Sequence, residues 1–269
     1  MPFLATGNDG LRYVVKLPGA LSHSNALFNE AAGAELYRAL GLPTPMWRLV
    51  YLPAEILALF DARRFDGGAS SRSNISFGSC CVWRPEDRVT DLLPSSSFAR
   101  IKQPELFWLA WLTDVCASHA NKRQALFIED SDRRILPQFI DHKEMFGGVN
   151  GGETPTPVAS RYLDPRAYPA FADETCRVID RHILSLDCDT LIRRINCLPT
   201  DWRTSDAQKS FAAALDRLTQ RRVWESLLEN ISLISHAPGK PDDANRHPNL
   251  QVSTADVRCA SGDRQSRST

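Results

Sequence analysis

The sequence predicts an α+β fold in which strands and helices alternate in the first half and helices make up the second half. Short apolar runs separated by turn residues fill the chain up to about residue 140, and such runs are typical of strands. From about residue 168 the apolar residues recur at helical spacing, over about 168–183, 187–197 and 206–233. The 269 residues, of which 43% are hydrophobic, suffice for one large domain or for two lobes around a cleft.

The first half is predicted to begin with a β-hairpin at residues 1–17, because residues 6–10 (TGNDG) have the composition of a tight turn between two apolar runs. A helix is expected at 25–40, since its apolar spacing is helical and Gly41 is a typical C-terminal signal. The remaining elements of this half are strands at 46–52, 75–83, 124–128 and 135–140, a short helix at 53–60 and a helix at 104–118.

Helix 104–118 is hydrophobic nearly all round, which predicts a buried position. Two segments rich in glycine and polar residues, 63–74 and 147–157, are expected to be loops. Residues 236–269 contain many polar, charged and proline residues and few apolar ones, so we expect a disordered tail.

Charge and cysteine content exclude several classes of protein. Lys+Arg and Asp+Glu both number 32, and a net charge of +0 leaves no basic excess for binding nucleic acid. The seven cysteines are an odd number without a C-x-x-C motif, which favours reduced thiols. Neither a signal peptide nor an apolar stretch of about 20 residues is evident. We therefore expect a cytoplasmic protein that binds neither nucleic acid nor membrane.

Lys16 and Glu30 are the first candidate site residues. Lys16 ends an alternating strand, and Glu30 lies on the following helix. Kinase-type sites hold a strand lysine on the nucleotide phosphates by pairing it with a helix glutamate. The simpler interpretations are a surface lysine and a first-turn acid favoured by the helix dipole.

The second group of candidates follows the buried helix and a late strand. Polar residues 118–124 connect helix 104–118 to a strand, and catalytic groups often lie on such loops. Asp141 emerges from an apolar strand shortly before Gly147 and Gly148, as expected for an acid that holds Mg²⁺ against phosphates. Arg123 is expected either to pair with a loop acid or to reach phosphate. Asp114 is expected to anchor the loop, and its alternative role is that of a substitute general base.

Together these features resemble the HipA-like kinases, specifically the branch of mostly stand-alone HipA-like domains, over roughly residues 1–232. The resemblance rests on segments 13–16 (YVVK), 28–30 (FNE), 41–45 (GLPTP), 77–79 (FGS), 123–127 (RQALF), 139–142 (FIDH), 146–148 (FGG), 198–202 (LPTDW) and 218–222 (LTQRR).

The resemblance implies a two-lobed protein-kinase-like fold within residues 1–235. A small β-rich N-terminal lobe would span about 1–100 and a larger helical C-terminal lobe about 101–235, with ATP and Mg²⁺ between them. It also implies roles for individual residues. Lys16, Glu30, Arg123 and Gln124 would form the nucleotide site, and Asp141 would bind Mg²⁺.

The chain departs from the family pattern at three places. Related sequences read Asn-x-Asp-x-Arg-Gln in the loop, which places His119 at the usual asparagine and Asn121 at the usual catalytic aspartate. An amide cannot take a proton, whereas His119 has an ordinary pKa near neutrality and is the alternative base. Its simpler interpretation is a helix C-terminal cap. Lys143 replaces a glycine. Residue 1 falls inside the first hairpin, so either the true start lies upstream or the phosphate-covering loop of the family is truncated.

Two hypotheses about function follow. The first is a kinase that transfers phosphate from ATP to a serine or threonine of a protein, with Asn121 or His119 orienting the acceptor. The second is a degenerate kinase fold that senses nucleotide or binds a protein regulator without turnover. The retained lysine and acids favour nucleotide binding under both hypotheses.

Overall fold

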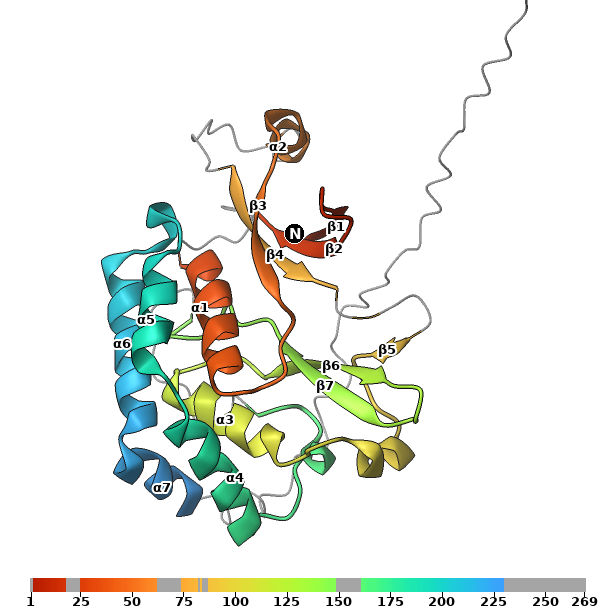
Figure 1. The fold of residues 1–269 in the computed structure, drawn as a ribbon, viewed down its shortest axis with the longest axis vertical. Helices are drawn as coiled ribbons and strands as arrows, with labels where there is room; N and C mark the ends of the chain where they lie inside the picture. The colour runs from red at the N-terminus through yellow and green to blue at the C-terminus, as the bar shows by residue number, and fades with distance from the viewer. Residues whose placement is uncertain are drawn as a thin grey trace, which may run out of the picture. The chain divides into compact units, whose positions relative to one another are not determined.

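A computed structural model describes most of the first 229 residues, and residues 1–235 form one compact unit. The described residues are 2–17, 25–61, 74–81, 83, 87–148 and 161–229. They form antiparallel sheets and several helices (Figure 1). The predicted disordered tail at 236–269 and all but Asn74 of the predicted loop at 63–74 lie outside this part of the chain.

The first sheet has the strand order β1-β2-β4-β3, and all neighbouring strands are antiparallel. Its strands are β1 (Phe3–Thr6), β2 (Arg12–Lys16), β3 (Trp47–Tyr51) and β4 (Ile75–Cys80). The predicted hairpin is confirmed, because β1 pairs directly with β2 and the turn is closed by a hydrogen bond from Gly7 N to Leu11 O. Lys16 is the last residue of β2, a central strand.

Helix α1 (Ala26–Ala39) is the predicted helix and is buried along most of its length. It ends where expected, because Gly41 has φ +70° and Leu42 N donates to the carbonyl of Tyr37. The helix thus ends with a residue of positive φ, a conformation that glycine adopts without the steric cost of a Cβ atom. Short helix α2 (Ala54–Asp61) follows β3, also as predicted.

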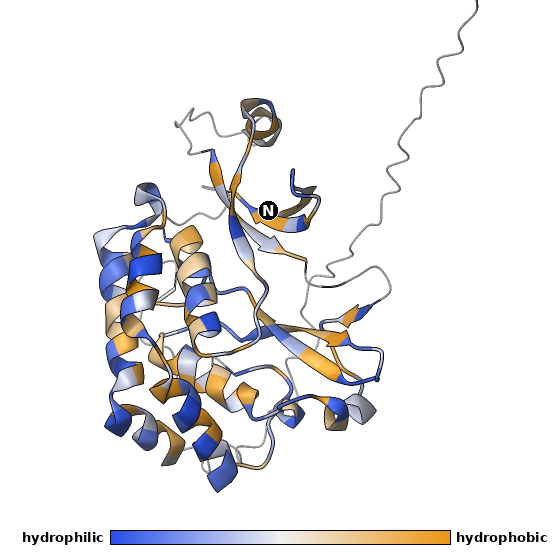
Figure 2. Ribbon diagram, in the orientation of Figure 1, coloured by the Kyte–Doolittle hydropathy of each residue, from blue (hydrophilic) through white to orange (hydrophobic). Residues whose placement is uncertain are grey.

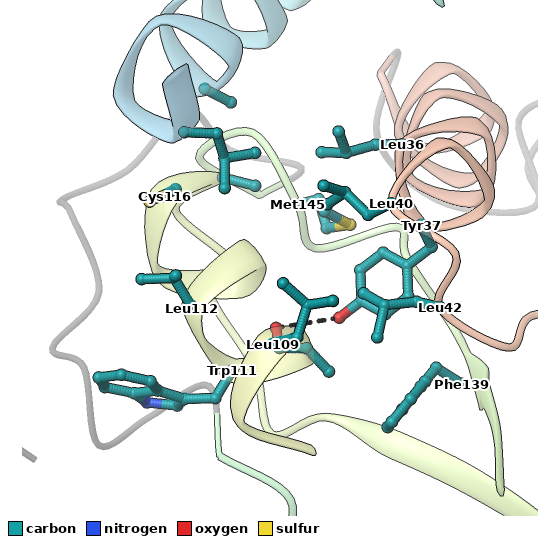
Figure 3. Packing of buried hydrophobic residues seen from close by; sticks show 14 of the residues in the cluster. Leu36, Tyr37, Leu40, Leu42, Leu109, Trp111, Leu112, Cys116, Phe139 and Met145 are labelled. Carbon is teal, nitrogen blue, oxygen red and sulfur yellow. Dashed lines mark hydrogen bonds between the residues drawn. The ribbon is translucent and has the colours of Figure 1, made fainter. Parts of the chain in front are cut away.

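Helix α3 (Leu106–Cys116) lies at the centre of the core. All of its residues except Val115 are buried, which confirms the prediction from its composition. Figure 3 shows its side chains beside those of α1 and of the segment that follows β7. The side chains packed there include Leu36, Leu40, Leu109, Leu112, Phe139 and Met145.

The second sheet has the order β5-β6-β7 and contains one strand that the sequence did not predict. Strands β6 (Gln124–Glu129) and β7 (Ile135–Ile140) form the expected hairpin, whose turn is held by Asp130 through the backbone N–H groups of Asp132 and Arg134. Strand β5 (Arg88–Thr90) has three residues, too few to show a periodic pattern.

The C-terminal helices are α4 (Asp173–Leu184), α5 (Cys188–Asn196), α6 (Ser205–Thr219) and α7 (Arg221–Glu229). Figure 2 shows hydrophilic residues over much of their surface. Two boundaries differ from the prediction. The helix expected from 168 begins at Asp173, because Tyr168 precedes a proline and is extended, with ψ 119°. The helix expected at 206–233 breaks at Gln220, which has ψ 98°, and Trp224 of α7 is buried.

The sequence predicted no membrane-spanning segment and reduced cysteines. None of the described helices combines the length and the apolar composition that a membrane span requires. The described cysteines are all free thiols: Cys80, Cys81, Cys116, Cys176, Cys188 and Cys197.

Gly33 is a position where α1 approaches the segment after β7 closely. A Cβ atom at residue 33 would lie 2.5 Å from His142 Cβ and 2.7 Å from Met145 Sδ. Gly33→Ala is therefore expected to destabilise the protein by about 1–3 kcal/mol through overpacking, although alanine gains about 1 kcal/mol in helix propensity. Urea unfolding measures the difference.

The matched control is Ala213→Gly on an exposed position of α6. It should lose about 1 kcal/mol by propensity alone. A Gly33→Ala variant more stable than the parent protein would contradict the close approach.

Candidate functional site

The candidate site forms where the end of β2, the first turns of α1 and the segment after β7 meet. Lys16 Nζ forms a salt bridge with Glu30 Oε1 and another, at 2.9 Å, with Asp141 Oδ1. Three predicted site residues, separated by up to 125 positions in the sequence, therefore share one cluster. All three side chains are largely buried.

Glu30 links the lysine to the segment after β7. Its Oε1 accepts from Lys16, and its Oε2 accepts from the backbone N–H of His142 at 3.2 Å. Burial raises the pKa of Glu30, and the ammonium of Lys16 opposes this shift. Burial alone would lower the pKa of Lys16, but the carboxylates of Glu30 and Asp141 more than offset this, so its pKa is raised and the lysine stays charged.

Asp141 presents both carboxylate oxygens to donors. Oδ1 faces Lys16, while Oδ2 accepts from Gln124 Nε2 at 3.1 Å and lies 3.4 Å from Lys143 Nζ. Burial alone would raise the pKa of Asp141, but the two ammonium groups outweigh it and hold the pKa below its ordinary range. Asp141 is therefore an anion at neutral pH. Its backbone is left-handed, with φ +62°, a region in which Asp and Asn are enriched among non-glycine residues.

Asn29 fixes the segment that follows Asp141, a role the sequence did not reveal. Its Nδ2 donates to the carbonyls of Lys143 and Met145, both at 2.8 Å. Asn29 is buried, and a buried amide is rarely found without such partners. The available signal was a polar residue inside the alanine-rich and leucine-rich sequence of α1.

Arg123 and Asp114 form a buried ion pair. The pair is bidentate: Nε of Arg123 donates to Asp114 Oδ2 at 2.8 Å, and Nη2 donates to Asp114 Oδ1. Tyr37 completes the group, because its hydroxyl donates to Asp114 Oδ1 at 2.7 Å and its ring lies 4.8 Å from the guanidinium carbon. Asp114 therefore anchors the loop through a side chain, in keeping with the structural role expected for it.

The third nitrogen of Arg123 is directed at the end of β7. Nη1 donates to the carbonyl of Ile140 at 2.9 Å and lies 3.3 Å from His142 Nδ1. The guanidinium is buried and surrounded by protein acceptors. This arrangement matches the alternative in which Arg123 pairs with an acid, and the nucleotide contact also predicted for Arg123 stays a prediction. Arg123 positions the backbone that carries Asp141.

His142 extends this hydrogen-bond network from Arg123 to Thr44. Because arginine can only donate, Nδ1 of His142 is the acceptor and the proton resides on Nε2. Nε2 lies 3.2 Å from Thr44 Oγ1, which in turn donates to the carbonyl of Phe139 at 2.8 Å. Burial, followed by the charge of Arg123, lowers the pKa of His142 well below its ordinary value, so the ring is neutral.

The loop between α3 and β6 carries the two predicted catalytic residues. Asn121 is exposed, and its side-chain oxygen accepts from Lys122 N at 2.8 Å. His119 is buried, and its Nδ1 lies 2.6 Å from the carbonyl of Asn121. Asn121 N also lies 3.4 Å from Nδ1. The shorter contact is to a carbonyl, which can only accept, and it favours a proton on Nδ1; Nε2 is then a buried acceptor for which the described residues provide no hydrogen bond. Burial lowers the pKa of His119.

Backbone hydrogen bonds join this loop to the segment after Asp141. Ala120 N donates to Glu144 O at 2.9 Å, Phe146 N to Ala117 O at 2.6 Å and Gly147 N to Ser118 O at 3.1 Å. The loop that bears Asn121 and the segment that bears Asp141 therefore form one paired unit. A displacement of either loop moves the other.

The residues present fit a Mg²⁺ ion that is bound together with a nucleotide. Mg²⁺ sites commonly use one or two carboxylates plus substrate phosphates, and Asp141 supplies one ionised carboxylate. Among the described residues, no group of three or more His, Cys, Asp or Glu side chains is arranged to hold a metal ion by itself. Phosphate oxygens and waters would complete the coordination of such an ion.

The Asp114–Arg123 pair gives a stability prediction. Asp114→Asn should destabilise the protein by about 3–5 kcal/mol, because Arg123 would remain charged in the interior without an anionic partner. Asp206→Asn is the matched control, since it removes the same charge from the exposed pair with Lys209, at 3.8 Å, and should leave stability nearly unchanged. Urea unfolding compares the variants, and equal stabilities would contradict the structural role of the pair.

Comparison with known proteins agrees with this geometry. A search of the curated proteins found no match. The family model described as HipA-like kinase matches residues 1–227. This match includes Lys16, Glu30, the loop with Asn121, and Asp141, and it spans most of the 269 residues. The chain therefore belongs to the HipA-like kinase family.

Proposed function

We propose that this HipA-like kinase binds ATP with Mg²⁺ and transfers the γ-phosphate to a serine or threonine of a protein. Lys16 positions the phosphates, Glu30 holds Lys16, and Asp141 binds Mg²⁺, with Gln124 beside it in the nucleotide site. Mg²⁺ supplies charge neutralisation on the phosphates when it is bound. The observation that carries the proposal is the Lys16–Glu30–Asp141 cluster. A lysine that pairs with a helix glutamate and lies beside a metal-binding aspartate is the arrangement with which kinases bind nucleotide phosphates.

We also propose that the two sheets belong to two lobes. The first sheet and α1 would lie in an N-terminal lobe of about residues 1–100, and β6 and β7 with α3 to α7 in a C-terminal lobe of about 101–235. Strand β5 falls in the first range by residue number but pairs with β6 of the second. The salt bridges of Lys16 then connect the lobes at the nucleotide site. This arrangement is supported by the position of Lys16 on the first sheet, whereas Asp141 directly follows β7 of the second sheet.

In the transfer step, the bond between the γ-phosphorus and its bridging oxygen breaks, and a bond to the acceptor hydroxyl oxygen forms. ADP leaves, and the hydroxyl proton must be released. Asn121 can orient the hydroxyl but cannot accept that proton. His119 can accept a proton only at Nε2, which is buried, so its role as a base requires the loop to open.

The alternative is a degenerate kinase that binds nucleotide or a protein regulator without turnover. One observation favours it. Residues 117–124 contain no carboxylate, and the nearest one on α3, Asp114, is buried and paired with Arg123. No acid is thus available on this loop as a general base, a group that usually contributes about 10²–10⁴-fold to rate.

Binding of ATP in the presence of Mg²⁺, measured by calorimetry, tests the nucleotide site. We expect the parent chain to bind and Lys16→Ala and Asp141→Ala to lose binding by about 10-fold or more, because each removes a charged contact that is largely buried. Lys209→Ala on the exposed face of α6 is the control and should bind normally. Failure of the parent chain to bind ATP would refute the proposal, and unaltered binding by both site variants would refute the residue assignment.

Transfer of labelled γ-phosphate separates an active kinase from a degenerate one. Asp141→Asn should abolish transfer and preserve the fold, since only the charge is removed. Asn121→Asp should raise turnover by about 10²-fold or more, because it restores a general base to the loop. Transfer that appears only in Asn121→Asp would favour the degenerate kinase, and transfer unaffected by Asp141→Asn would remove the metal assignment.

A further inference from the structure

Asp141 lies between two ammonium groups. Lys16 Nζ is 2.9 Å from one carboxylate oxygen, and Lys143 Nζ is 3.4 Å from the other. Gln124 adds a third donor at 3.1 Å. The carboxylate on which a divalent ion would depend is thus already neutralised by groups of the chain itself.

Lys143 has a fixed backbone and a more accessible side chain. Its carbonyl accepts from Asn29 Nδ2 at 2.8 Å, and the preceding residue, His142, is buried and hydrogen-bonded to Glu30. The side chain of Lys143 is 30% exposed, compared with 15% for Lys16. The ammonium of Lys143 is therefore held beside Asp141 at the more open side of the cluster, where an incoming anion can reach it.

The charges of the cluster cancel. Glu30 and Asp141 contribute two negative charges, and Lys16 and Lys143 contribute two positive charges. The adjacent Asp114–Arg123 pair is also balanced. Divalent cations are attracted to sites with excess negative charge, which this cluster lacks. The lysine ammonium groups of the cluster can instead bind a phosphate group, because lysine binds phosphate as a compact point charge.

We propose that Lys143 is a phosphate-binding residue that supplies part of the positive charge otherwise brought by a divalent ion, so that nucleotide binding depends only weakly on Mg²⁺. This inference rests on the proposed nucleotide site and adds a residue to it. Lys16 and Lys143 contact phosphate oxygens, and Asp141 keeps both lysines in place. Mg²⁺ still contributes when present, but binding of ATP does not require it.

Calorimetry with ATP, in buffer containing either Mg²⁺ or EDTA, tests this inference. For each protein the ratio of the dissociation constant in EDTA to that in Mg²⁺ is the measured quantity. The parent chain should show a ratio below about 10, and Lys143→Gln, which keeps much of the length but not the charge, should raise the ratio by about 10-fold or more. Lys143→Arg, which keeps the charge, should preserve the parent ratio.

Lys122→Gln is the matched control, because Lys122 is an exposed lysine on the neighbouring loop, and it should leave the ratio unchanged. Binding of Mn²⁺ in the presence of ADP, followed by electron paramagnetic resonance, gives a second measurement. Lys143→Gln should bind Mn²⁺ more tightly than the parent chain, since a competing cation is removed.

The outcomes distinguish this inference from the proposed function. If the parent chain binds ATP but Lys143→Gln has the parent ratio, the inference is overturned and the nucleotide site stands. A parent chain that binds ATP only with Mg²⁺ overturns the inference in the same way. Absence of ATP binding by the parent chain in both buffers overturns the proposed function and the inference together.

Discussion

The buried ion pair of Asp114 and Arg123 is the interaction on which the geometry of the site depends. It joins α3 to the start of β6, and through Nη1 of Arg123 it also holds the end of β7. Asp141 follows directly and has a left-handed backbone, which surrounding contacts must maintain in a residue that is not glycine. Helix α3 therefore helps to position Asp141, the proposed metal ligand, although Asp114 and Asp141 are not in contact in the described structure.

A second support comes from α1. Glu30 and Asn29 are neighbours in sequence, yet they hold different parts of the same segment: Glu30 binds the backbone of His142, and Asn29 binds the carbonyls of Lys143 and Met145. The close approach at Gly33 lets this segment lie directly on the helix. The site is thus assembled against one face of α1, and the salt bridge of Lys16 with Glu30 connects it to the first sheet.

The sequence predicted most elements of the fold because their signals are local. The hairpin turn at 6–10, the glycine that ends α1 and the apolar composition of α3 each act within a few residues. The same reasoning missed the break between α6 and α7 at Gln220, which depends on tertiary packing. It also missed β5, whose three residues are too few to show a pattern. Lys16, Glu30 and Asp141 could be found from their positions at the ends or beginnings of elements.

The inner network could not be found in this way. The pairing of Arg123 with Asp114, and the link from His142 to Thr44, join residues whose side chains carry no local pattern that names a partner. Sequence reasoning left Arg123 between pairing with a loop acid and reaching a phosphate, because arginine commonly binds phosphate and its burial is a property of the folded core.

The salt bridges of Lys16 have a consequence for how the protein becomes functional. They bring together residues 16, 30 and 141, so the site exists only after β2, α1 and β7 have all found their places. During synthesis the emerging chain cannot complete this cluster until the end of β7 has been made. A ligand that binds there stabilises only the completed arrangement, in proportion to its concentration relative to its dissociation constant. Nucleotide, the ligand proposed for this site, would thus selectively stabilise fully assembled molecules.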